Sequence, residues 1–470
     1  MRKTKIICTI GPASNSEEMI RKLAEAGMNV ARFNFSHGTH EQHKRDMDTV
    51  KKVRAELGMP IAIMLDTKGP EYRIGTFENG SVTLVEGAEF SFTSLDVIGN
   101  DERVSVSYPK MIDELQNGDS ILLCNGLVSL RVERKTDTEL ICRVVNGGVV
   151  SNRKSMSFPN KVLHQKYLSE NDKKDLLFGI ENEVDFIACS FVSCKEDIND
   201  VRNFLHENGC DDIDLIAKIE NRAGVDNIEE IINASDGIMV ARGDMGVEIP
   251  YEQLPAIQKK LINDCRIIGK RSITATEMLE SMISNPRPTR AEISDVANAV
   301  YDGTSAIMLS GETAAGKYPV ESVKAMSKIA EETENNINYT KRFKSTEFQM
   351  KNTIDAISHA TCGVAIDIEA KAIVVCSLGG GTVRMVSRFR APIDIIGLTT
   401  NERAWRKLAL SWAVTPVMSE EFPSTEVLFY HAGNTAKSIY RLAPSDKIVI
   451  TGGITNGKSG NTNLIKIHTI

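Results

Sequence analysis

The chain has no apolar run of 18 residues, the shortest length that predicts a membrane-spanning helix. Its first stretch, MRKTKIICTIGP, holds five apolar residues before Gly11, which is too few for the core of a signal peptide. We therefore expect no membrane partner and no secretion signal.

Clustered cysteine is also missing. The nine cysteines are scattered without a Cys-x-x-Cys pair, and the two nearest in sequence, Cys189 and Cys194, have no clustered metal ligands beside them. A zinc site is therefore unexpected. The pattern is typical of reduced thiols in a cytosolic protein, so we predict a cytoplasmic location.

A block of positive charge is the third missing feature. The chain has 56 Lys and Arg against 63 Asp and Glu, with a formal charge of −7 and a pI near 5.8. This argues against a nucleic-acid partner, so an anionic ligand would need a local basic pocket. The 470 residues, 41% hydrophobic and 25% charged, suffice for about three globular domains.

What the chain does contain is an alternation of short β-type apolar runs with longer amphipathic stretches. Such alternation predicts parallel βαβ units. Eight runs predict a closed (β/α)₈ TIM barrel, whose strands are apolar because both faces are covered. The runs lie at residues 5–12, 28–38, 61–70, 185–192, 214–221, 237–244, 272–279 and 306–312.

Two regions depart from this alternation. Residues 71–163 hold many short β-type runs, which predicts a small all-β lid domain inserted after the third barrel strand, with Asn125-Gly126 as a type I′ hairpin signal. Helix and strand patterns start afresh near Thr346. The predicted α/β fold is therefore a barrel of residues 1–70 and 164–345, the lid, and a C-terminal open α/β domain of residues 346–470 for regulation or oligomerisation.

Polar side chains enter at the end of almost every barrel run. Barrels of this kind carry their chemistry at the carboxyl ends of the strands, so we expect these side chains at one open mouth. Strands that simply end in polar turns would explain Asn or Asp but not the recurring Lys, Arg and Glu. The residues are Asn34, Asp66, Ser190, Lys218, Asp244, Thr276 and Glu312.

The run DLIAKIEN places Lys218 and Glu220 two residues apart in an otherwise apolar segment. Either charge is costly to bury unless it is paired. Glu220 and Asp244 would offer hard oxygen ligands with open positions, which suits Mg²⁺. Lys218 and Arg32 would neutralise a phosphoryl group beside that ion. A plain ion pair between Lys218 and Glu220 is the rival interpretation.

A second polar cluster consists of oxygen donors with a single full charge. It would form a cage for a monovalent cation, and a network of turn hydrogen bonds explains it equally well. Its members are Asn34, Ser36, Asp66 and Thr67, and Thr276 adds a hydroxyl beside the reacting centre.

Over nearly its whole length the chain resembles the pyruvate kinase family. The matching stretches are KTKIICTIGPAS (3–14), NVARFNFSHG (29–38), DTKGPE (66–71), AKIEN (217–221), VARGDMGVEIP (240–250), ATEMLESM (275–282), RPTRAE (287–292) and DVANAVYDGTSAIMLSGETAAGKYP (295–319). The resemblance implies phosphoryl transfer from phosphoenolpyruvate to ADP, giving pyruvate and ATP. It also implies Mg²⁺ (or Mn²⁺) and K⁺ as cofactors, and a homotetramer.

The resemblance also implies roles for single residues. Catalysis falls to Lys218, Arg32 and Thr276, and substrate contacts come from these three with Gly243 and Asp244. Mg²⁺ is held by Glu220 and Asp244, and K⁺ by the cluster of Asn34, Ser36, Asp66 and Thr67. The nucleotide meets Asn34, His37, Arg73 and Lys154. Glu71 stands where the family has an acid in its K⁺-dependent members, so we expect K⁺ activation.

Two loops depart from the family pattern. The lid hairpin has Cys124 and Asn125 where two acids are usual, and its return strand has Ser155 and Asn160 where glycines are usual, which weakens the role of Lys154. A loop opening a helix in the last domain and a second loop near the C-terminus resemble the site of a phosphorylated effector. Backbone donors could hold a phosphate there, and two flexible glycine-rich turns explain the loops equally well. The candidate effector residues are Ser377, Thr382, Ser459 and Gly460.

Two other functions fit parts of the pattern. A catalytically weak metabolite-sensing paralogue would explain the altered lid and effector loop. A Mg²⁺-dependent aldolase acting on pyruvate enolate would use the same barrel mouth, but it would give Lys218 and the K⁺ cluster no task.

Overall fold

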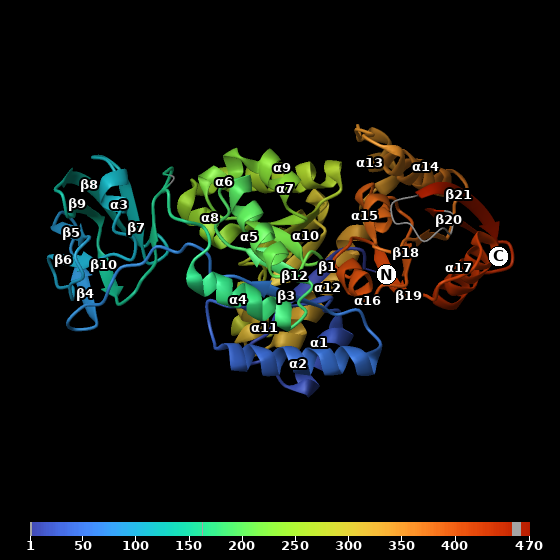
Figure 1. Ribbon diagram of the computed structural model, residues 1–470, viewed down its shortest axis with the longest axis horizontal. Coiled ribbons are helices and arrows are strands. Elements are labelled where there is room, and N and C mark those ends of the chain that lie inside the picture. The colour runs from blue at the N-terminus through green and yellow to red at the C-terminus, as the bar shows by residue number, and fades with distance from the viewer. Residues whose placement is uncertain (1, 162, 454–461) are drawn as a thin grey trace.

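The computed structural model describes residues 2–161, 163–453 and 462–470. Figure 1 shows a β lid at one end, a barrel in the middle and a C-terminal α/β domain at the other end, where both termini lie. This arrangement confirms the predicted fold class.

The barrel is a closed ring of eight parallel strands in the order β1-β16-β15-β14-β13-β12-β3-β2. The side chains of the strands are buried almost without exception, as expected where helices cover the outside and side chains fill the inside. The strands are β1 Lys5–Thr9, β2 Val30–Asn34, β3 Ala62–Asp66, β12 Phe186–Cys189, β13 Asp214–Ile219, β14 Gly237–Ala241, β15 Arg271–Ala275 and β16 Ala306–Leu309.

Helices surround the barrel, and local capping chemistry sets their ends. In α10 the Thr289 side chain accepts from the Glu292 backbone while Glu292 reaches back, which forms a capping box. In the described ranges no helix is both long and apolar enough to cross a bilayer. The barrel helices are α1 Glu17–Ala26, α2 His40–Leu57, α4 Glu170–Glu181, α5 Lys195–Glu207, α6 Arg222–Asp226, α7 Ile228–Ala234, α8 Arg242–Glu248, η1 Tyr251–Gln253, α9 Leu254–Ile268, η2 Glu280–Ile283, α10 Arg290–Asp302, α11 Gly311–Ala314, α12 Pro319–Asn335 and α13 Tyr339–Ser345.

Several barrel strands end earlier than their apolar runs. The run 237–244 ends as a helix, because β14 stops at Ala241 and Asp244 lies in the first turn of α8. Glu220 and Thr276 likewise follow the last residues of β13 and β15. Glu220, Asp244 and Thr276 thus follow their strands. Lys218 and Arg32 lie inside β13 and β2, and Asn34 and Asp66 are the last residues of β2 and β3.

The lid consists of a six-stranded sheet, β11-β7-β8-β9-β5-β6, and a two-stranded sheet, β10-β4. At its hairpin Cys124 (φ 55°) and Asn125 (φ 56°) are the two central turn residues, since the Gly126 N–H bonds to the Leu123 carbonyl at 3.1 Å. The pair expected there, Asn125-Gly126, is thus shifted by one residue. The elements are β4 Ser81–Leu84, β5 Glu89–Thr93, β6 Arg103–Ser105, α3 Met111–Glu114, β7 Ser120–Leu123, β8 Val128–Lys135, β9 Glu139–Asn146, β10 Gly148–Ser151 and β11 Met156–Ser157.

The C-terminal domain has a five-stranded sheet in the order β19-β18-β17-β20-β21, parallel except for β21. Its elements are α14 Thr353–Asp367, β17 Ala372–Cys376, α15 Gly381–Arg388, β18 Ile395–Thr399, α16 Glu402–Leu408, β19 Val414–Met418, α17 Thr425–Tyr440, β20 Lys447–Gly453 and β21 Thr462–Thr469.

This domain contacts the barrel at the amino-terminal ends of the strands, opposite the expected catalytic mouth. Leu410 belongs to the apolar cluster that fills the barrel interior. Asp185, just before β12, accepts a hydrogen bond of 2.8 Å from Arg406 Nε. The Ala413 N–H donates to the Lys3 carbonyl at 2.9 Å. We call this end the barrel base.

Candidate active site

Lys218 stands at the centre of the mouth. The residue is only 9% exposed, and its Nζ donates to Ser190 Oγ at 2.6 Å and to Asp66 Oδ1 at 3.1 Å. It lies 3.0 Å from Glu220 Oε1. Burial lowers the pKa of Lys218, but the charges of Asp66 and Glu220 outweigh burial and raise it above its ordinary value. The lysine is therefore a fixed cation.

Arg32 is the second cation of the mouth. Its Nε donates a hydrogen bond to Asp66 Oδ2 at 2.7 Å, and its Nη1 donates one to Thr9 Oγ1 at 2.8 Å. Burial raises the pKa of Asp66, yet the charges of Arg32 and Lys218 outweigh burial and hold it below its usual range. Asp66 thus fixes both cations side by side.

Glu220 is fully buried and incompletely paired. Its Oε2 accepts from the Phe191 N–H at 2.5 Å, whereas Oε1, although close to Lys218 Nζ, makes no hydrogen bond. Burial raises the pKa of Glu220 to about 7 against the opposing charge of Lys218, and the charge of Asp244 adds to the rise. The ion pair between Lys218 and Glu220, which was the rival interpretation, does form. It still leaves one oxygen of the Glu220 carboxylate without a hydrogen bond.

The acidic pair fits a hard divalent cation. Asp244 is exposed in the first turn of α8 and close enough to Glu220 to raise the pKa of that residue. Within the described ranges no group of three or more His, Cys, Asp or Glu gathers as a metal site. An ion held by two carboxylates must complete its shell with water or ligand oxygens, which is how Mg²⁺ binds.

Thr276 lies at a strained turn beside Asp244. Its backbone has φ 67°, and its Oγ1 accepts from the Gly243 N–H at 2.8 Å and donates to the Ala275 carbonyl at 2.6 Å. A positive φ is unfavourable for a β-branched residue and is tolerated where neighbouring contacts fix it. The hydroxyl therefore ties the end of β15 to the first turn of α8.

The predicted K⁺ residues cluster where β2 and β3 end. Asn34 is the direct register partner of Asp66. Asn34 Oδ1 accepts from the Ser36 N–H at 3.1 Å, and Thr67 Oγ1 accepts from the Ser190 N–H at 3.2 Å. The cluster thus forms turn hydrogen bonds and also offers oxygen donors. It fits a cation cage and a network of turn hydrogen bonds equally well.

Of the predicted nucleotide residues, Asn34 ends β2 at the mouth, whereas Arg73 and Lys154 belong to the lid and lie outside its named strands. Arg73 donates to the Arg153 carbonyl at 2.6 Å and pairs with Glu71 at 2.6 Å. Lys154, next to that carbonyl, is exposed, as is His37 on the turn after β2. No hydrogen bond or ion pair of the described residues links Arg73 or Lys154 to Lys218.

Two residues that the sequence left without a role support the mouth. Ser190 Oγ accepts from Lys218 and donates to the Thr67 carbonyl at 2.6 Å, so it orients the lysine. Arg242 donates to the Thr276 carbonyl at 2.7 Å and pairs with Asp295 at 2.7 Å. Polarity at a strand end points to Ser190, but nothing in the sequence predicts the target of Arg242.

The candidate effector loops are partly described. Thr382, in the first turn of α15, is buried, and its hydroxyl is hydrogen bonded to that of Thr462 at 2.5 Å. The Ser377 N–H donates to the Leu398 carbonyl at 2.9 Å. The start of α15 and the start of β21 therefore meet. Ser459 and Gly460 lie outside the described residues.

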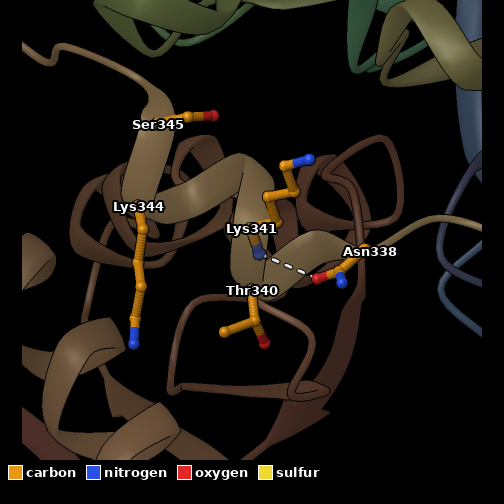
Figure 2. A pocket seen from close by; sticks show the side chains of 5 residues that line it. All are labelled: Asn338, Thr340, Lys341, Lys344 and Ser345. Carbon is orange, nitrogen blue, oxygen red and sulfur yellow. Dashed lines mark hydrogen bonds between the residues drawn. The ribbon is translucent and has the colours of Figure 1, made fainter.

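A separate hollow on α13 has neither buried cations nor acidic side chains in its wall. Figure 2 shows Lys341 and Lys344 pointing away from each other, while the Lys341 N–H binds the Asn338 side chain at 2.8 Å as an ordinary helix cap. Both lysines are exposed. Solvated lysines on a short helix need no ligand.

Both the sequence and the fold have counterparts among known proteins. The family models for "Pyruvate kinase, barrel domain" and "Pyruvate kinase, alpha/beta domain" match residues 1–323 and 355–468. A pyruvate kinase of Clostridium acetobutylicum is 46% identical, covering 100% of both chains. One of Geobacillus stearothermophilus is 46% identical, covering 100% of this chain and 80% of its own. A solved pyruvate kinase from Cryptosporidium parvum has a TM-score of 0.95 and 37% identity, covering 100% of this chain and 96% of that one.

Proposed function

Because the chain belongs to the pyruvate kinase family, we propose that Lys218 at the barrel mouth is the cation on which its reaction depends. That reaction moves the phosphoryl group of phosphoenolpyruvate to ADP and gives pyruvate and ATP. The observation that carries the assignment is the buried arrangement of Lys218, Glu220 and Asp66, which places fixed positive charge beside an unsatisfied carboxylate oxygen.

Glu220 and Asp244 would hold Mg²⁺ or Mn²⁺. Such an ion, when bound, supplies positive charge that stabilises the phosphoryl oxygens and the enolate. The free oxygen of Glu220 and the exposure of Asp244 support this pair.

The protein's own cations bind and orient the phosphoryl group. Lys218 Nζ has three acceptors around it, and phosphoryl oxygens would replace some of them as ligand enters. Arg32, fixed by Asp66, would contact the same group from the neighbouring strand. Because Asp66 aligns both cations beforehand, little reorganisation is needed during transfer.

Thr276 and Gly243 would contact the substrate carboxylate. The Thr276 hydroxyl ties the end of β15 to the start of α8. There it would donate to the carboxylate of the substrate and stand near the enolate carbon that takes up a proton.

The cluster of Asn34, Ser36, Asp66 and Thr67 would bind K⁺. Its oxygen donors carry one full charge, that of Asp66, which forms ion pairs with both Arg32 and Lys218. Glu71 supports dependence on K⁺, because members of the family that need no K⁺ have a lysine at this place.

Arg73, Lys154, Asn34 and His37 would meet the nucleotide, with the lid closing over it. A closed lid excludes water and suppresses hydrolysis of the phosphoryl group. One contact between the lid and the barrel supports a lid that closes over the mouth. The Phe158 N–H of the lid donates to Glu248 Oε1 of α8 at 3.2 Å. The effector residues, the homotetramer and the cytoplasmic location stay predictions.

Membership of the family does not favour the two alternative functions, a metabolite-sensing paralogue and a Mg²⁺-dependent aldolase. The test is pyruvate formation from phosphoenolpyruvate, measured with and without ADP, Mg²⁺ and K⁺. We expect turnover that requires ADP and a divalent ion and rises with K⁺. A silent, folded protein would support the sensor, and turnover of another substrate without nucleotide would support the aldolase.

A further inference from the structure

A basic hollow lies at the barrel base, between the barrel and the C-terminal domain. We call it the arginine hollow. Its walls come from the end of α9, the starts of β15 and β16, α15 and the segment before β19, and its empty volume is about 270 Å³, including space open to solvent. Its cations are Arg266, Lys270, Arg271, Arg384, Arg388 and Arg390.

Negative charge around the arginine hollow is scarce. Two carboxylates of the described residues form ion pairs with its cations, Asp214 with Arg271 at 2.6 Å and Asp355 with Arg388 at 3.5 Å. Asp214 is already shared with Lys407. Arg266 and Arg390 are in no ion pair within the described ranges. The six cations thus have only two carboxylates of the described part of the chain within ion-pair range, while Asp236 and Glu334 act on Lys270 and Arg390 from beyond that range. An excess of positive charge of this kind is costly to bury.

Several donors in the arginine hollow are buried and unused. Arg388 and Arg390 are 5% and 3% exposed, and Nε of each has no hydrogen-bond partner. The hydroxyl of Ser411, 3% exposed, is also without a partner, as are Nε and Nη1 of Arg266. Buried polar groups in native proteins are nearly always hydrogen bonded, so orphaned donors in one hollow indicate a missing acceptor.

The guanidinium group of Arg390 is held in place by hydrogen bonds and by an aromatic ring. Arg390 donates to the Gly303 carbonyl at 3.2 Å and to Ser305 Oγ at 3.0 Å, and its guanidinium lies 4.7 Å from the Trp412 ring centre. Burial and the nearby charge of Arg266 lower the pKa of Arg390 to about 9, so it stays charged at neutral pH. Arg390 is thus a fixed donor in a hollow whose positive charge is only partly balanced by the protein.

We propose that the arginine hollow binds a small tetrahedral oxyanion, either inorganic phosphate or the single phosphate group of a small metabolite. Arginine suits this ligand, because its planar fork binds phosphate oxygens in pairs. The hollow is small, which favours one phosphate group over a nucleotide. The site lies at the opposite end of the barrel from Lys218. Arg384, in its wall, follows Thr382 on α15, but neither Ser377 nor Thr382 lines the hollow. It does not depend on the proposed function of the mouth.

The direct test is binding of inorganic phosphate to the full chain, measured by calorimetry at constant ionic strength. The mouth also has cations, so the number of sites is compared among variants. We expect Arg266→Gln and Ser411→Ala to lose one phosphate per chain. Arg403→Gln is the matched control, because Arg403 lies at the same domain junction and pairs with Asp212 but does not line the hollow.

Two results would overturn the proposal. One is the same number of phosphate sites in wild type and in Arg266→Gln. The other is an equal loss in Arg403→Gln, which would show a general effect of the junction. Turnover of phosphoenolpyruvate should stay unchanged in all three variants, since none of these residues lies at the mouth.

Thermal unfolding distinguishes an anion site from a merely structural arginine. In chloride of low ionic strength, Arg266→Gln should be as stable as wild type or more so, because it relieves repulsion. Phosphate at ten times its Kd should raise the melting temperature of wild type by about 2 °C and leave Arg266→Gln unchanged. Equal destabilisation of the variant with and without phosphate would refute the proposal.

The source of the anion is decided by competition. Glycerol 3-phosphate that displaces inorganic phosphate from the hollow identifies a phosphate monoester as ligand, and failure to compete identifies the free ion. Either result supports the tetrahedral oxyanion. Equal displacement by chloride at the same ionic strength would contradict it.

Discussion

Replacing Lys218 with methionine tests the central assignment, because methionine keeps most of the side-chain volume and removes the charge. Lys218 Nζ is nearly buried within 3.1 Å of three oxygen atoms, so a phosphoryl oxygen in place of one of them would lie at similar range. At 4 Å and an effective dielectric constant of 20, such a pair interacts by about 4 kcal/mol. If that interaction is made in the transition state, kcat should fall about 10³-fold.

The cost in stability should be smaller than this loss of activity. Breaking a buried ion pair costs about 3–5 kcal/mol when a charge is left alone. Asp66, however, keeps Arg32 at 2.7 Å, and burial already raises the pKa of Glu220 to about 7, so this residue can accept a proton. We expect Lys218→Met to lose about 2 kcal/mol and to remain folded.

The assay is the steady-state rate of pyruvate formation, with far-UV circular dichroism and thermal unfolding as folding controls. Lys5→Met is the matched control, because Lys5 is also a buried strand lysine, 7% exposed, but lies at the barrel base and donates to the Val414 carbonyl. It should keep its turnover. More than a tenth of wild-type turnover in Lys218→Met, or an equal loss in Lys5→Met, would refute the reasoning.

Three further substitutions test other parts of the site. Glu71→Lys supplies a positive charge four residues after Thr67 of the predicted K⁺ cluster and should raise the rate measured without K⁺; an unchanged K⁺ requirement contradicts this. Burial raises the pKa of Glu248 from 4.5 to about 7, so its contribution to stability is full below pH 4.5 and is lost as the pH rises through 7. Glu248→Gln should therefore stabilise the protein at pH 8 by up to about 3 kcal/mol but not at pH 4, and equal melting temperatures of the two proteins at pH 8 would refute it. Thr276→Val leaves the Gly243 N–H unpaired, which should cost about 1–3 kcal/mol in thermal unfolding and lower kcat/KM; Thr276→Ser should keep both, and loss in the serine variant would contradict the role of the hydroxyl.

The barrel could be predicted from sequence because its strands are buried on both faces and so read as apolar runs. That burial also made the charge of Lys218 stand out. The contact between Lys218 and Asp66 joins residues 152 positions apart, and its 3.1 Å distance follows from the closed ring of strands and not from any local pattern. Glu220 shows the same limit, because it follows β13 and turns back towards Lys218.

The barrel base was less predictable still. Sequence periodicity shows that a second α/β unit exists but not which surface it covers. Leu410 is one apolar residue among many until the fold places it in the barrel interior. Arg266 and Arg390 are 124 positions apart and join only when the C-terminal domain contacts α9, so the overall acidic composition gives no sign of this local cluster of cations.

The two ends of the barrel treat buried positive charge in opposite ways. At the mouth, Lys218 and Arg32 have Asp66 between them, and phosphoryl oxygens need only exchange with existing acceptors. At the base, Arg266 and Arg390 have no carboxylate within ion-pair range in the described ranges, so an anion there would supply charge that the fold lacks. Mouth ligands should therefore be bound and released at modest cost, as turnover requires. A base ligand should act chiefly on the contact between the two domains, because it would contact α9 and α15 together.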